Sequence, residues 1–363
     1  MDELLPDVRR IAVLRANGLG DFVVAVPALE ALRAAYPAAG ITLIGRPWHV
    51  ELLAGRPGPW DEVVAAPPYP VMTAPPDAPV DSPAARRFFT WARGRRFDLA
   101  VQLHGGGGQS NPFVAGLGAR LTVGARDTGA PALDRWLRYA LYQHEVLRWL
   151  EVVGLVGARA VTVQPALAVT ASDRSAAAPH LTAVPPGAPL VAVHPGASDP
   201  RRRWPPERFA TVVGALARSG ACVALVGDGD DVALCARILE RCGPGVAGRV
   251  VDLSGRLSLP ALVGVLAAAR LVIANDSGPR HLAEAVGTPT VGVYWVGNLV
   301  TAGPLTRGRH RVAISFRTTC PVCGDDQSRG RCPHDDPWVG DVPVDEVLAS
   351  AHELLTAGAH ELL

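Results

Sequence analysis

Short apolar segments alternate with helical patterns along most of the chain, and this alternation constrains the fold more than any other feature. In the first part the strand-like segments are "IAVLRA" (11–16), "GITLIG" (40–45), "DEVVAA" (61–66), "DLAVQLH" (98–104) and "RLTVGA" (120–125). A helix is expected after residue 82, with Ser82 as its N-cap and Pro83 in its first turn. Strands separated by helices predict an α/β fold with a parallel sheet.

The alternation is interrupted once and then restarts. Residues 166–188 are small and Pro-rich with few large apolar groups, which is typical of an interdomain linker, and "LVAVHPG" begins the second series. A chain of 363 residues is also long enough for two domains, which implies a cleft. We therefore expect an N-terminal domain over 1–165, a C-terminal domain over 189–343, and a last helix within 344–363 that packs back on the N-terminal domain.

The composition is that of a globular protein. Hydrophobic residues make up 48%, charged residues 19%, and the formal net charge is +1, which argues against disorder and against nucleic-acid binding. The chain contains no lysine, so all 35 basic residues are arginine. No apolar run has transmembrane length and "MDELLPDVRR" does not resemble a signal peptide, so a cytoplasmic location is expected.

The first polar motif is "RANGLGDFVV", where a strand runs into a glycine loop and a helix. Gly18 and Gly20 allow a close approach of a ligand to the backbone. Asp21 can serve as an N-cap or, facing a cleft, as a general base. Val23 stands where a dinucleotide fingerprint needs glycine, which disfavours an NAD-dependent oxidoreductase.

The second motif is "HPGASDPRRRWPPERF" (194–209), which joins a strand to a helix opening at Pro205 or Pro206. Ser198, Arg202 and Arg203 offer a hydroxyl and guanidinium groups to a phosphate-bearing ligand. The alternative is a solvated basic turn without a ligand.

The third motif is "NDSGPRHLAEAVG", in which Pro279 opens a short helix and Gly287 caps it. The helix start favours a phosphate close to Ser277 and Gly278, with His281 as a further donor. Asp276 can accept hydrogen bonds from sugar hydroxyls, or act only as an N-cap.

A fourth segment, "LHGGGGQSNPF" (103–113), follows a strand of the N-terminal half. Its glycines expose backbone, and His104, Gln109, Ser110 and Asn111 could read hydroxyl groups of an acceptor. A flexible tip without a ligand is the alternative.

The segment "CPVCGDDQSRGRCPHDD" collects thiols and an imidazole near the end of the chain. Three thiolates and an imidazole can close a tetrahedral structural zinc site, although the last spacing is too short for a standard finger. Reduced thiols that hold a local turn are the alternative. The candidate ligands are Cys320, Cys323, Cys332 and His334.

Taken together, these motifs resemble glycosyltransferase family 9, the ADP-heptose:lipopolysaccharide heptosyltransferase family. The resemblance runs from about residue 10 to 355 and includes "DLSGRLSLPALVGVLAAARLVIANDSGPRHLAEAVGTPTVGVY". It implies a GT-B fold of two doubly wound Rossmann-like domains facing a central cleft. The acceptor would bind the N-terminal domain and an ADP-sugar the C-terminal one, and transfer would invert the anomeric carbon without a metal.

The resemblance also implies residue roles. The family's base in its Leu-Gly-Asp motif falls on Asp21, and its lysine two residues before Trp-Pro falls on Arg202, so the cation is kept while its type changes. The donor motif falls on Asp276, Ser277, Gly278 and His281. The acid that contacts the nucleotide ribose, often Glu in the family, falls on Asp231, whose reach is shorter.

The expected function is therefore inverting transfer of a sugar, heptose in the family, from an ADP-sugar to an acceptor hydroxyl. The acceptor would be the lipopolysaccharide core or, in a source without lipopolysaccharide, a secondary metabolite or cell-wall glycan. A glycolipid acceptor implies peripheral contact with the inner membrane face. The competing interpretation is a nucleotide-sugar-binding protein without transfer activity.

Overall fold

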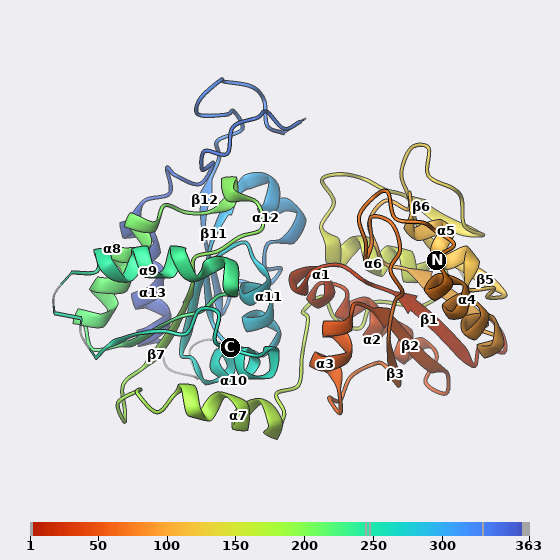
Figure 1. Cartoon of the computed structure of the whole chain (residues 1–363), viewed down its shortest axis with the longest axis horizontal. Coiled ribbons are helices and arrows are strands. Elements are labelled where there is room, and N and C mark those ends of the chain that lie inside the picture. Colours follow the sequence, from red (N-terminus) through yellow and green to blue (C-terminus); the bar gives the residue numbers. More distant parts are fainter. Residues whose placement is uncertain (1–2, 244, 247, 329, 358–363) are drawn as a thin grey trace. The chain divides into compact units, whose positions relative to one another are not determined.

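The computed structural model describes residues 3–243, 245–246, 248–328 and 330–357. The chain divides into two compact units, Met1–Ala168 and Val169–Leu363, and each contains one six-stranded sheet (Figure 1). The strand orders are β3-β2-β1-β4-β5-β6 and β12-β11-β10-β7-β8-β9, and every strand pair is parallel. Counted from its own first strand, each sheet has the same doubly wound order, as in dinucleotide-binding folds. The predicted α/β class is confirmed.

In the first unit, helices alternate with the strands as the sequence pattern predicts. The elements are β1 (Arg10–Leu14), α1 (Leu19–Val23), α2 (Val26–Ala35), β2 (Gly40–Gly45), α3 (Pro47–Leu53), β3 (Glu62–Ala65), α4 (Pro83–Arg95), β4 (Leu99–Gln102), α5 (Ser110–Gly116), β5 (Leu121–Arg126), β6 (Arg135–Arg138) and α6 (Glu145–Gly154).

Local sequence explains the helix boundaries of this unit. Ser82 caps α4 by accepting a hydrogen bond from the N–H of Ala85, as expected. Pro27 occupies the first turn of α2, so the helical segment after β1 is broken into α1 and α2. Strand β6 was not predicted, because only alternate residues of its "RWLR" sequence are partly buried at the sheet edge.

The second unit repeats the plan after a short helical segment. Its elements are α7 (Ala171–Ala177), η1 (Ala178–His180), β7 (Leu190–His194), η2 (Pro200–Arg202), α8 (Pro206–Arg218), β8 (Cys222–Leu225), η3 (Gly229–Asp231), α9 (Val232–Arg241), β9 (Val250–Asp252), α10 (Leu259–Ala268), β10 (Leu271–Asn275), α11 (Gly278–Ala285), β11 (Thr290–Trp295), α12 (Val296–Ala302), β12 (His310–Ser315) and α13 (Val344–Thr356).

The segment expected as a linker contains helix α7, which belongs to the second unit. Thr170 and Asp173 form a capping box that starts the helix. α7 packs against α10 so closely that a Cβ on Gly264 would lie 2.2 Å from the carbonyl oxygen of Asp173. Residues 169–188 are therefore partly structured, and the boundary falls at Ala168.

Helix α13 also differs from its expected placement. Its buried residues Val347, Ala351 and Leu354 lie in the hydrophobic core of the second unit, where α13 contacts α8. The expectation was packing on the N-terminal domain, but the apolar face of the helix is instead used within its own unit. Residues 358–363 of the expected terminal segment lie outside the described residues.

Both sheets carry their polar loops at the point where the strand order reverses. This point lies between β1 and β4 in the first unit and between β7 and β10 in the second. In open parallel sheets, ligands bind beyond the carboxyl ends of the strands at such a reversal. The motifs around Asp21 and His104, and those around Ser198 and Asp276, follow these four strands.

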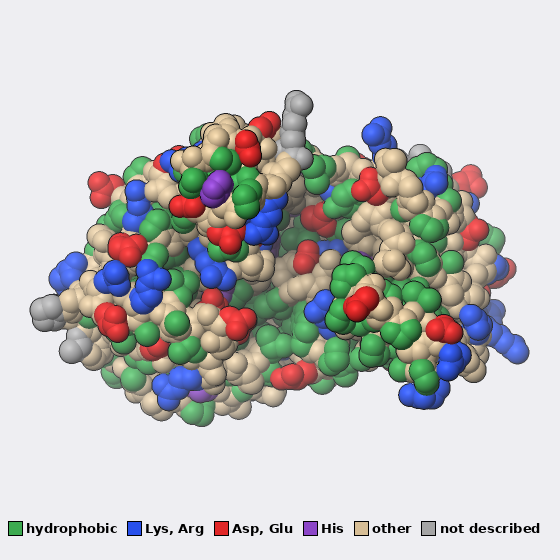
Figure 2. Space-filling model, turned by 45° about the horizontal axis from the view of Figure 1, so that its top comes forward, with side chains coloured by type: hydrophobic (Ala, Val, Ile, Leu, Met, Phe, Trp, Pro, Cys, Tyr) green, Lys and Arg blue, Asp and Glu red, His purple; other side chains and the backbone are tan. Residues whose placement is uncertain are grey.

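The surface drawn in Figure 2 carries interspersed basic and acidic side chains, in keeping with the formal net charge of +1. Among the residues that the structure describes, no helix combines the length and the apolar character needed to cross a bilayer.

Candidate functional site

Asp21 lies at the third position of α1, close to a buried arginine. Its Oδ2 accepts a hydrogen bond from the N–H of Gly18 (3.1 Å), and the side chain remains 47% exposed. Nη2 of Arg15 lies 3.4 Å from Oδ1, and Nε of Arg15 donates to the Asp21 carbonyl (2.7 Å). The N-cap is Gly18, so the interpretation of Asp21 as the N-cap is wrong; its carboxylate binds the Gly18 N–H from within the helix, and half of it still faces solvent. Gly20, the residue before Asp21, is also part of α1.

Arg15 holds this corner of the first unit together. It is buried above the ring of Trp149 at 5.0 Å and donates to the carbonyl oxygen of Leu103 after β4. Glu145 Oε2 lies 3.8 Å from its Nη2 atom. The guanidinium therefore links the loops after β1 and β4, so Asp21 and His104 belong to one connected site.

His104 and His49 are two imidazoles in this corner that remain uncharged at neutral pH. Nδ1 of His104 accepts from the N–H of Ala16 (3.2 Å), and Nδ1 of His49 accepts from the N–H of Arg46 (2.9 Å). Burial, and secondarily the charge of Arg15, lower the pKa of each to about 3. Sequence reasoning named His104 and missed His49, whose position in α3 carries no motif.

The glycine-rich segment after β4 buries two of its polar residues. Asn111 is 1% exposed, and its Nδ2 donates to the carbonyls of Ala125 (3.2 Å) and Pro131 (2.8 Å). These amide hydrogens hold the β5–β6 connection, while Oδ1 of Asn111 has no partner among the described residues, so its contact with an acceptor stays a prediction. Ser110 is likewise buried, whereas Gln109 is partly exposed at the start of α5.

In the second unit, the predicted donor residues form a connected polar network. Arg202 donates from Nη2 to Oγ of Ser198 (2.7 Å), and its Nη1 lies 3.0 Å from Oδ2 of Asp276. The other oxygen of Asp276 lies 3.2 Å from Nε2 of His281. The loops after β7 and β10 are thereby joined by charged hydrogen bonds.

A second branch of the network runs through His194, the last residue of β7. Its Nδ1 lies 3.0 Å from Oγ of Ser277, and its Nε2 lies 3.2 Å from Oδ2 of Asp231. Gly196 is required beside it, because a Cβ there would lie 2.1 Å from Oδ1 of Asp231. Asp231 is mostly buried, with Arg203 among the charges that act on it.

The charge pattern keeps both carboxylates ionised. Burial opposes ionisation of Asp276, but the hydrogen bond from His281 and the charges of Arg202 and Arg280 hold its pKa below the usual value. Burial likewise opposes ionisation of Asp231, and the hydrogen bond from His194 lowers its pKa.

The start of α11 completes the site. Ser277 is the N-cap in an extended conformation and its side chain makes no capping bond, while Gly278 and Pro279 open the helix. The N–H groups of a helix start and its dipole favour an anion. The network can therefore present a hydroxyl, a guanidinium and a helix start to a diphosphate, and a carboxylate to hydroxyl groups.

Three residues that hold this geometry were missed in the sequence. They are His194, Asn275, whose Oδ1 accepts from the N–H of Trp204 (3.0 Å), and the buried Arg280, which pairs with Glu284 (2.9 Å). The available signal was polarity inside apolar elements, since His194 and Asn275 end strands in which every residue is buried.

The cysteine cluster predicted from the sequence is brought together. The ligand atoms of Cys320, Cys323, Cys332 and His334 all lie within 4.8 Å of one another. Sγ of Cys320 lies 3.7 Å from Nδ1 of His334, close to the roughly 3.6 Å edge of a tetrahedral zinc site with one sulfur and one nitrogen ligand. Desolvation opposes ionisation, but backbone N–H groups of Cys323 and Val322 and the neighbouring thiols lower the pKa of Cys320 to about 6. The donor set fits a divalent metal.

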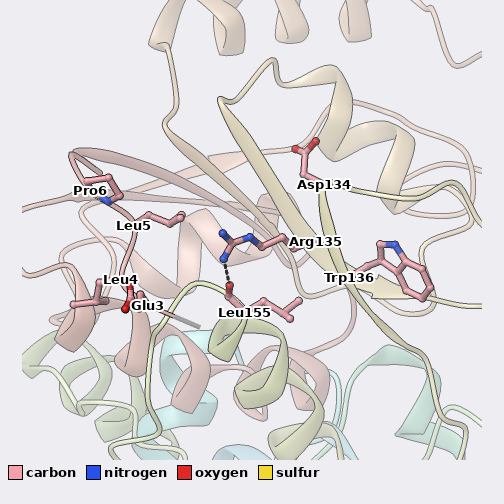
Figure 3. A pocket seen from close by; sticks show the side chains of 8 residues that line it. All are labelled: Glu3, Leu4, Leu5, Pro6, Asp134, Arg135, Trp136 and Leu155. Carbon is pink, nitrogen blue, oxygen red and sulfur yellow. Dashed lines mark hydrogen bonds between the residues drawn. The ribbon is translucent and has the colours of Figure 1, made fainter. Parts of the chain in front are cut away.

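A separate pocket of about 770 Å³ lies in the first unit (Figure 3). Arg135 and Trp136 begin β6 there, and Arg135 donates to the carbonyl of Leu155 (2.6 Å). The pocket is thus at the amino ends of the strands, the edge opposite to the polar loops. None of the predicted site residues lines it.

Curated relatives of this chain are heptosyltransferases. Lipooligosaccharide heptosyltransferase 2 of Haemophilus influenzae is 32% identical over 107 residues, which cover 29% of this chain and 31% of that protein. Lipopolysaccharide heptosyltransferase 2 of Escherichia coli K12 is 24% identical over 301 residues, 78% of this chain and 82% of the relative. The first of these alignments therefore spans only about a third of its relative.

Solved structures share the fold over nearly the whole chain. A family 9 glycosyltransferase from Veillonella parvula superposes with a TM-score of 0.76 at 21% identity, covering 96% of this chain and 97% of that one. E. coli heptosyltransferase WaaC with ADP gives a TM-score of 0.65 at 20% identity, with 95% and 99% covered. TibC, an iron-containing dodecameric glycosyltransferase from enterotoxigenic E. coli H10407, gives 0.56 at 16% identity, with 97% and 77% covered.

The family model for glycosyltransferase family 9 (heptosyltransferase) matches residues 85–329, which include β4 to β12, the polar loops after β7 and β10, and two of the four residues of the cysteine cluster. The two Rossmann-like sheets agree with the GT-B heptosyltransferase structures. The chain belongs to glycosyltransferase family 9, the heptosyltransferase family.

Proposed function

We propose that this chain is an inverting glycosyltransferase that moves heptose from ADP-heptose to an acceptor hydroxyl. The observation that carries the proposal is the network of Ser198, Arg202, Asp276 and His281 at the reversal point of the second sheet. It offers the groups that a sugar diphosphate needs: a cation, a hydroxyl and a helix start for the phosphates, and a carboxylate for sugar hydroxyls. The complex of WaaC with ADP, in a chain of the same fold, supports the choice of nucleotide.

In this proposal Asp21 is the general base. It would take the proton of the acceptor hydroxyl while the oxygen attacks the anomeric carbon, and the bond from that carbon to the diphosphate would break. Half of the Asp21 side chain is exposed, so the carboxylate is accessible to an acceptor. The proposed acceptor contacts are Gly18, Gly20, His104, Gln109 and Asn111.

The departing ADP would gain negative charge as the bond breaks. Arg202, Ser198, Ser277 and the start of α11 are the groups proposed to stabilise that charge, with His281 fixed by Asp276 beside them. Removal of one donor that acts on developing charge commonly costs about 3–4 kcal/mol of activation free energy. Asp231 would accept from the ribose hydroxyls, with Arg203 beside it.

The catalytic step proposed here uses only side chains and backbone, with no metal. The cysteine cluster is proposed to hold a structural zinc ion, because three thiolates and an imidazole at tetrahedral spacing suit zinc. Iron is the second candidate, since tetrahedral sulfur-rich sites also take iron and TibC is iron-containing. All six cysteines are unpaired, which suits the reducing cytoplasm where we propose the enzyme acts.

The proposed acceptor is a glycan, glycolipid or small-molecule hydroxyl, with the lipopolysaccharide core as the family's example. A glycolipid acceptor would bring the protein to the inner face of the membrane. The relatives named as lipopolysaccharide heptosyltransferases support this acceptor class.

The test is a transfer assay with purified protein, ADP-heptose and a panel of acceptors, read by mass spectrometry of the product. ADP-heptose should be consumed only when an acceptor is present, and UDP- and GDP-sugars should not replace it. Binding of ADP-heptose without transfer to any acceptor of the panel would favour the alternative, a nucleotide-sugar-binding protein. Binding of NAD but not of ADP would contradict both.

A further inference from the structure

Arg201 differs from the other residues of the arginine run because its side chain is buried. It is 6% exposed, and its guanidinium packs over the ring of Trp338 at 4.1 Å. Its Nε donates to Oδ1 of Asp199 (2.9 Å), and its Nη1 donates to Oε1 of Gln327 (3.5 Å). Arg201 therefore ties the loop that carries Arg202 to the segment after β12.

Gln327 sits between that guanidinium and the cysteine cluster. Its side chain is buried, its Nε2 donates to the carbonyl of Asp325 (3.0 Å), and its own N–H donates to the carbonyl of Thr318 (2.8 Å). The thiol of Cys332 lies 3.6 Å from the same Oε1 that faces Arg201. The side-chain amide of Gln327 thus contacts both a candidate metal ligand and the loop between β7 and α8 that carries Arg202, which we call the donor loop.

The backbone makes a second connection between the same two regions. The N–H of Trp338 donates to the carbonyl of Arg201 (2.8 Å). Trp338 in turn packs on Trp295 at the end of β11, with ring centroids 4.5 Å apart, and Nε1 of Trp295 donates to the carbonyl of Arg317 (2.6 Å). The two ends of the segment that carries the cysteines, drawn in blue after β12 in Figure 1, are therefore fixed beside the donor loop.

Resting on the function proposed above, we propose that metal binding at the cysteine cluster positions the donor loop, with Gln327 and Arg201 as the positioning residues. Three thiolates outweigh the charge of a divalent ion, so the loaded cluster is negative. Arg201 then lies between two anionic groups, the cluster and Asp199, and is held in place. The peptide that follows it carries Arg202, so the guanidinium that faces the diphosphate is held as well.

The test compares ADP binding by calorimetry in three preparations of the full chain without a His tag: zinc-loaded, chelator-stripped and zinc-restored. We expect one metal per chain in the loaded protein. Stripping should weaken ADP binding by about 5- to 150-fold, the usual range for coupling between two sites, and zinc should restore it. Thermal unfolding of each preparation checks that the fold is kept.

Gln327→Leu separates coupling from metal binding, because Gln327 is not a ligand. This variant should keep one metal per chain and bind ADP more weakly than the unsubstituted protein, with a smaller further loss on stripping, because only the charge of the cluster still acts on Arg201. Val322→Ala is the matched control: Val322 lies between two cysteines, is 56% exposed, and the change keeps the N–H that donates to Cys320. It should retain both metal and ADP affinity.

The outcomes distinguish this inference from the proposed function. Stoichiometric metal with ADP affinity unchanged by stripping and by Gln327→Leu would overturn the coupling and leave the transferase proposal standing. A chain that binds neither zinc nor iron would overturn the coupling at its first step, again without bearing on transfer. Zinc-loaded protein that fails to bind ADP at all would contradict both proposals.

Discussion

Nη1 of Arg202 lies 3.0 Å from Oδ2 of Asp276, so a cation from the loop after β7 is held by the carboxylate that begins the loop after β10. The two residues lie in the connections that follow β7 and β10, which are neighbouring strands at the reversal of the sheet order. Both are therefore placed by the fold itself.

Replacing Arg202 should weaken nucleotide binding. In Arg202→Ala the diphosphate loses a charge-assisted donor, for which a loss of about 1.5–3 kcal/mol, or roughly 10- to 150-fold in dissociation constant, is expected. Calorimetric titration with ADP measures it. Arg237→Ala, on the exposed side of α9 where Arg237 lies 3.7 Å from Glu207, is the matched control and should bind ADP normally. An unchanged dissociation constant in Arg202→Ala would count against its donor role.

Replacing Asp21 should stop transfer while leaving nucleotide binding near normal. Asp21→Asn keeps an oxygen for the N–H of Gly18, so α1 should still form. The amide cannot, however, take up the proton from the hydroxyl group of the sugar acceptor. Loss of a general base commonly lowers the rate about 10²- to 10⁴-fold. The assay is single-turnover transfer beside ADP titration.

Asp98→Asn is the control for this substitution. Asp98 also accepts backbone N–H groups, from Arg9 and Arg10, but at the amino ends of the strands. Its variant should transfer at the normal rate. Retained turnover in Asp21→Asn would refute the base assignment.

Acid should destabilise the first unit through His49. The pKa of His49 is about 3 in the folded chain, mainly because of burial, and its ordinary value is 6.5. At pH values between 3 and 6.5, His49 binds a proton in the unfolded chain but not in the folded chain. The free energy of unfolding therefore falls as the pH drops below 6.5, by about 1.4 kcal/mol per pH unit for one such group.

Urea unfolding at pH 7, 6 and 5 measures this slope. His49→Gln should lower stability at pH 7 but reduce the decline toward pH 5. His352→Gln, on the exposed surface of α13, should leave the slope as it is. Equal slopes in His49→Gln and the unsubstituted protein would show that His49 does not contribute.

The contact between α7 and α10 should be sensitive to a single methyl group. Gly264→Ala places a Cβ 2.2 Å from the Asp173 carbonyl and 2.6 Å from Cβ of Ala177, so the helices must separate. Overpacking of this kind costs about 1–3 kcal/mol, or roughly 2–4 °C per kcal/mol in a unit of this size. Differential scanning calorimetry measures the shift.

Gly94→Ala in α4 is the matched control for that change. A Cβ at Gly94 meets no atom within 4 Å, so the helix should gain about 0.5–1 kcal/mol. A Gly264→Ala variant as stable as the unsubstituted protein would mean that α7 does not pack on α10 in solution.

Sequence reasoning predicted the features that depend on local patterns. Alternating strands and helices gave the parallel sheets, and Asp21, Ser198, Arg202 and Asp276 were found because each follows a buried strand and precedes a helix. Such positions meet at one edge of a parallel sheet whatever the remaining sequence is.

The errors have physical causes in long-range contacts. The bonds from the Asn111 amide to carbonyls of the β5–β6 connection are long-range contacts that no local pattern shows. Helix α7 was included in a linker because it has few apolar groups. Its packing against α10 at Gly264, distant in sequence, is not visible in the local pattern. The capping box of Thr170 and Asp173 was a local signal that could have found it. His194 links two loops that only the sheet order brings together.

The bonds among Ser198, Arg202 and Asp276 also bear on the binding of a nucleotide. The guanidinium already has a hydroxyl and a carboxylate as partners, so its charge is largely satisfied within the protein. An entering anion must therefore compete with Ser198 and Asp276 for the hydrogen bonds of the Arg202 guanidinium. If the proposed function holds, the diphosphate must therefore offset the loss of these internal bonds through its contacts with Ser277 and the start of α11.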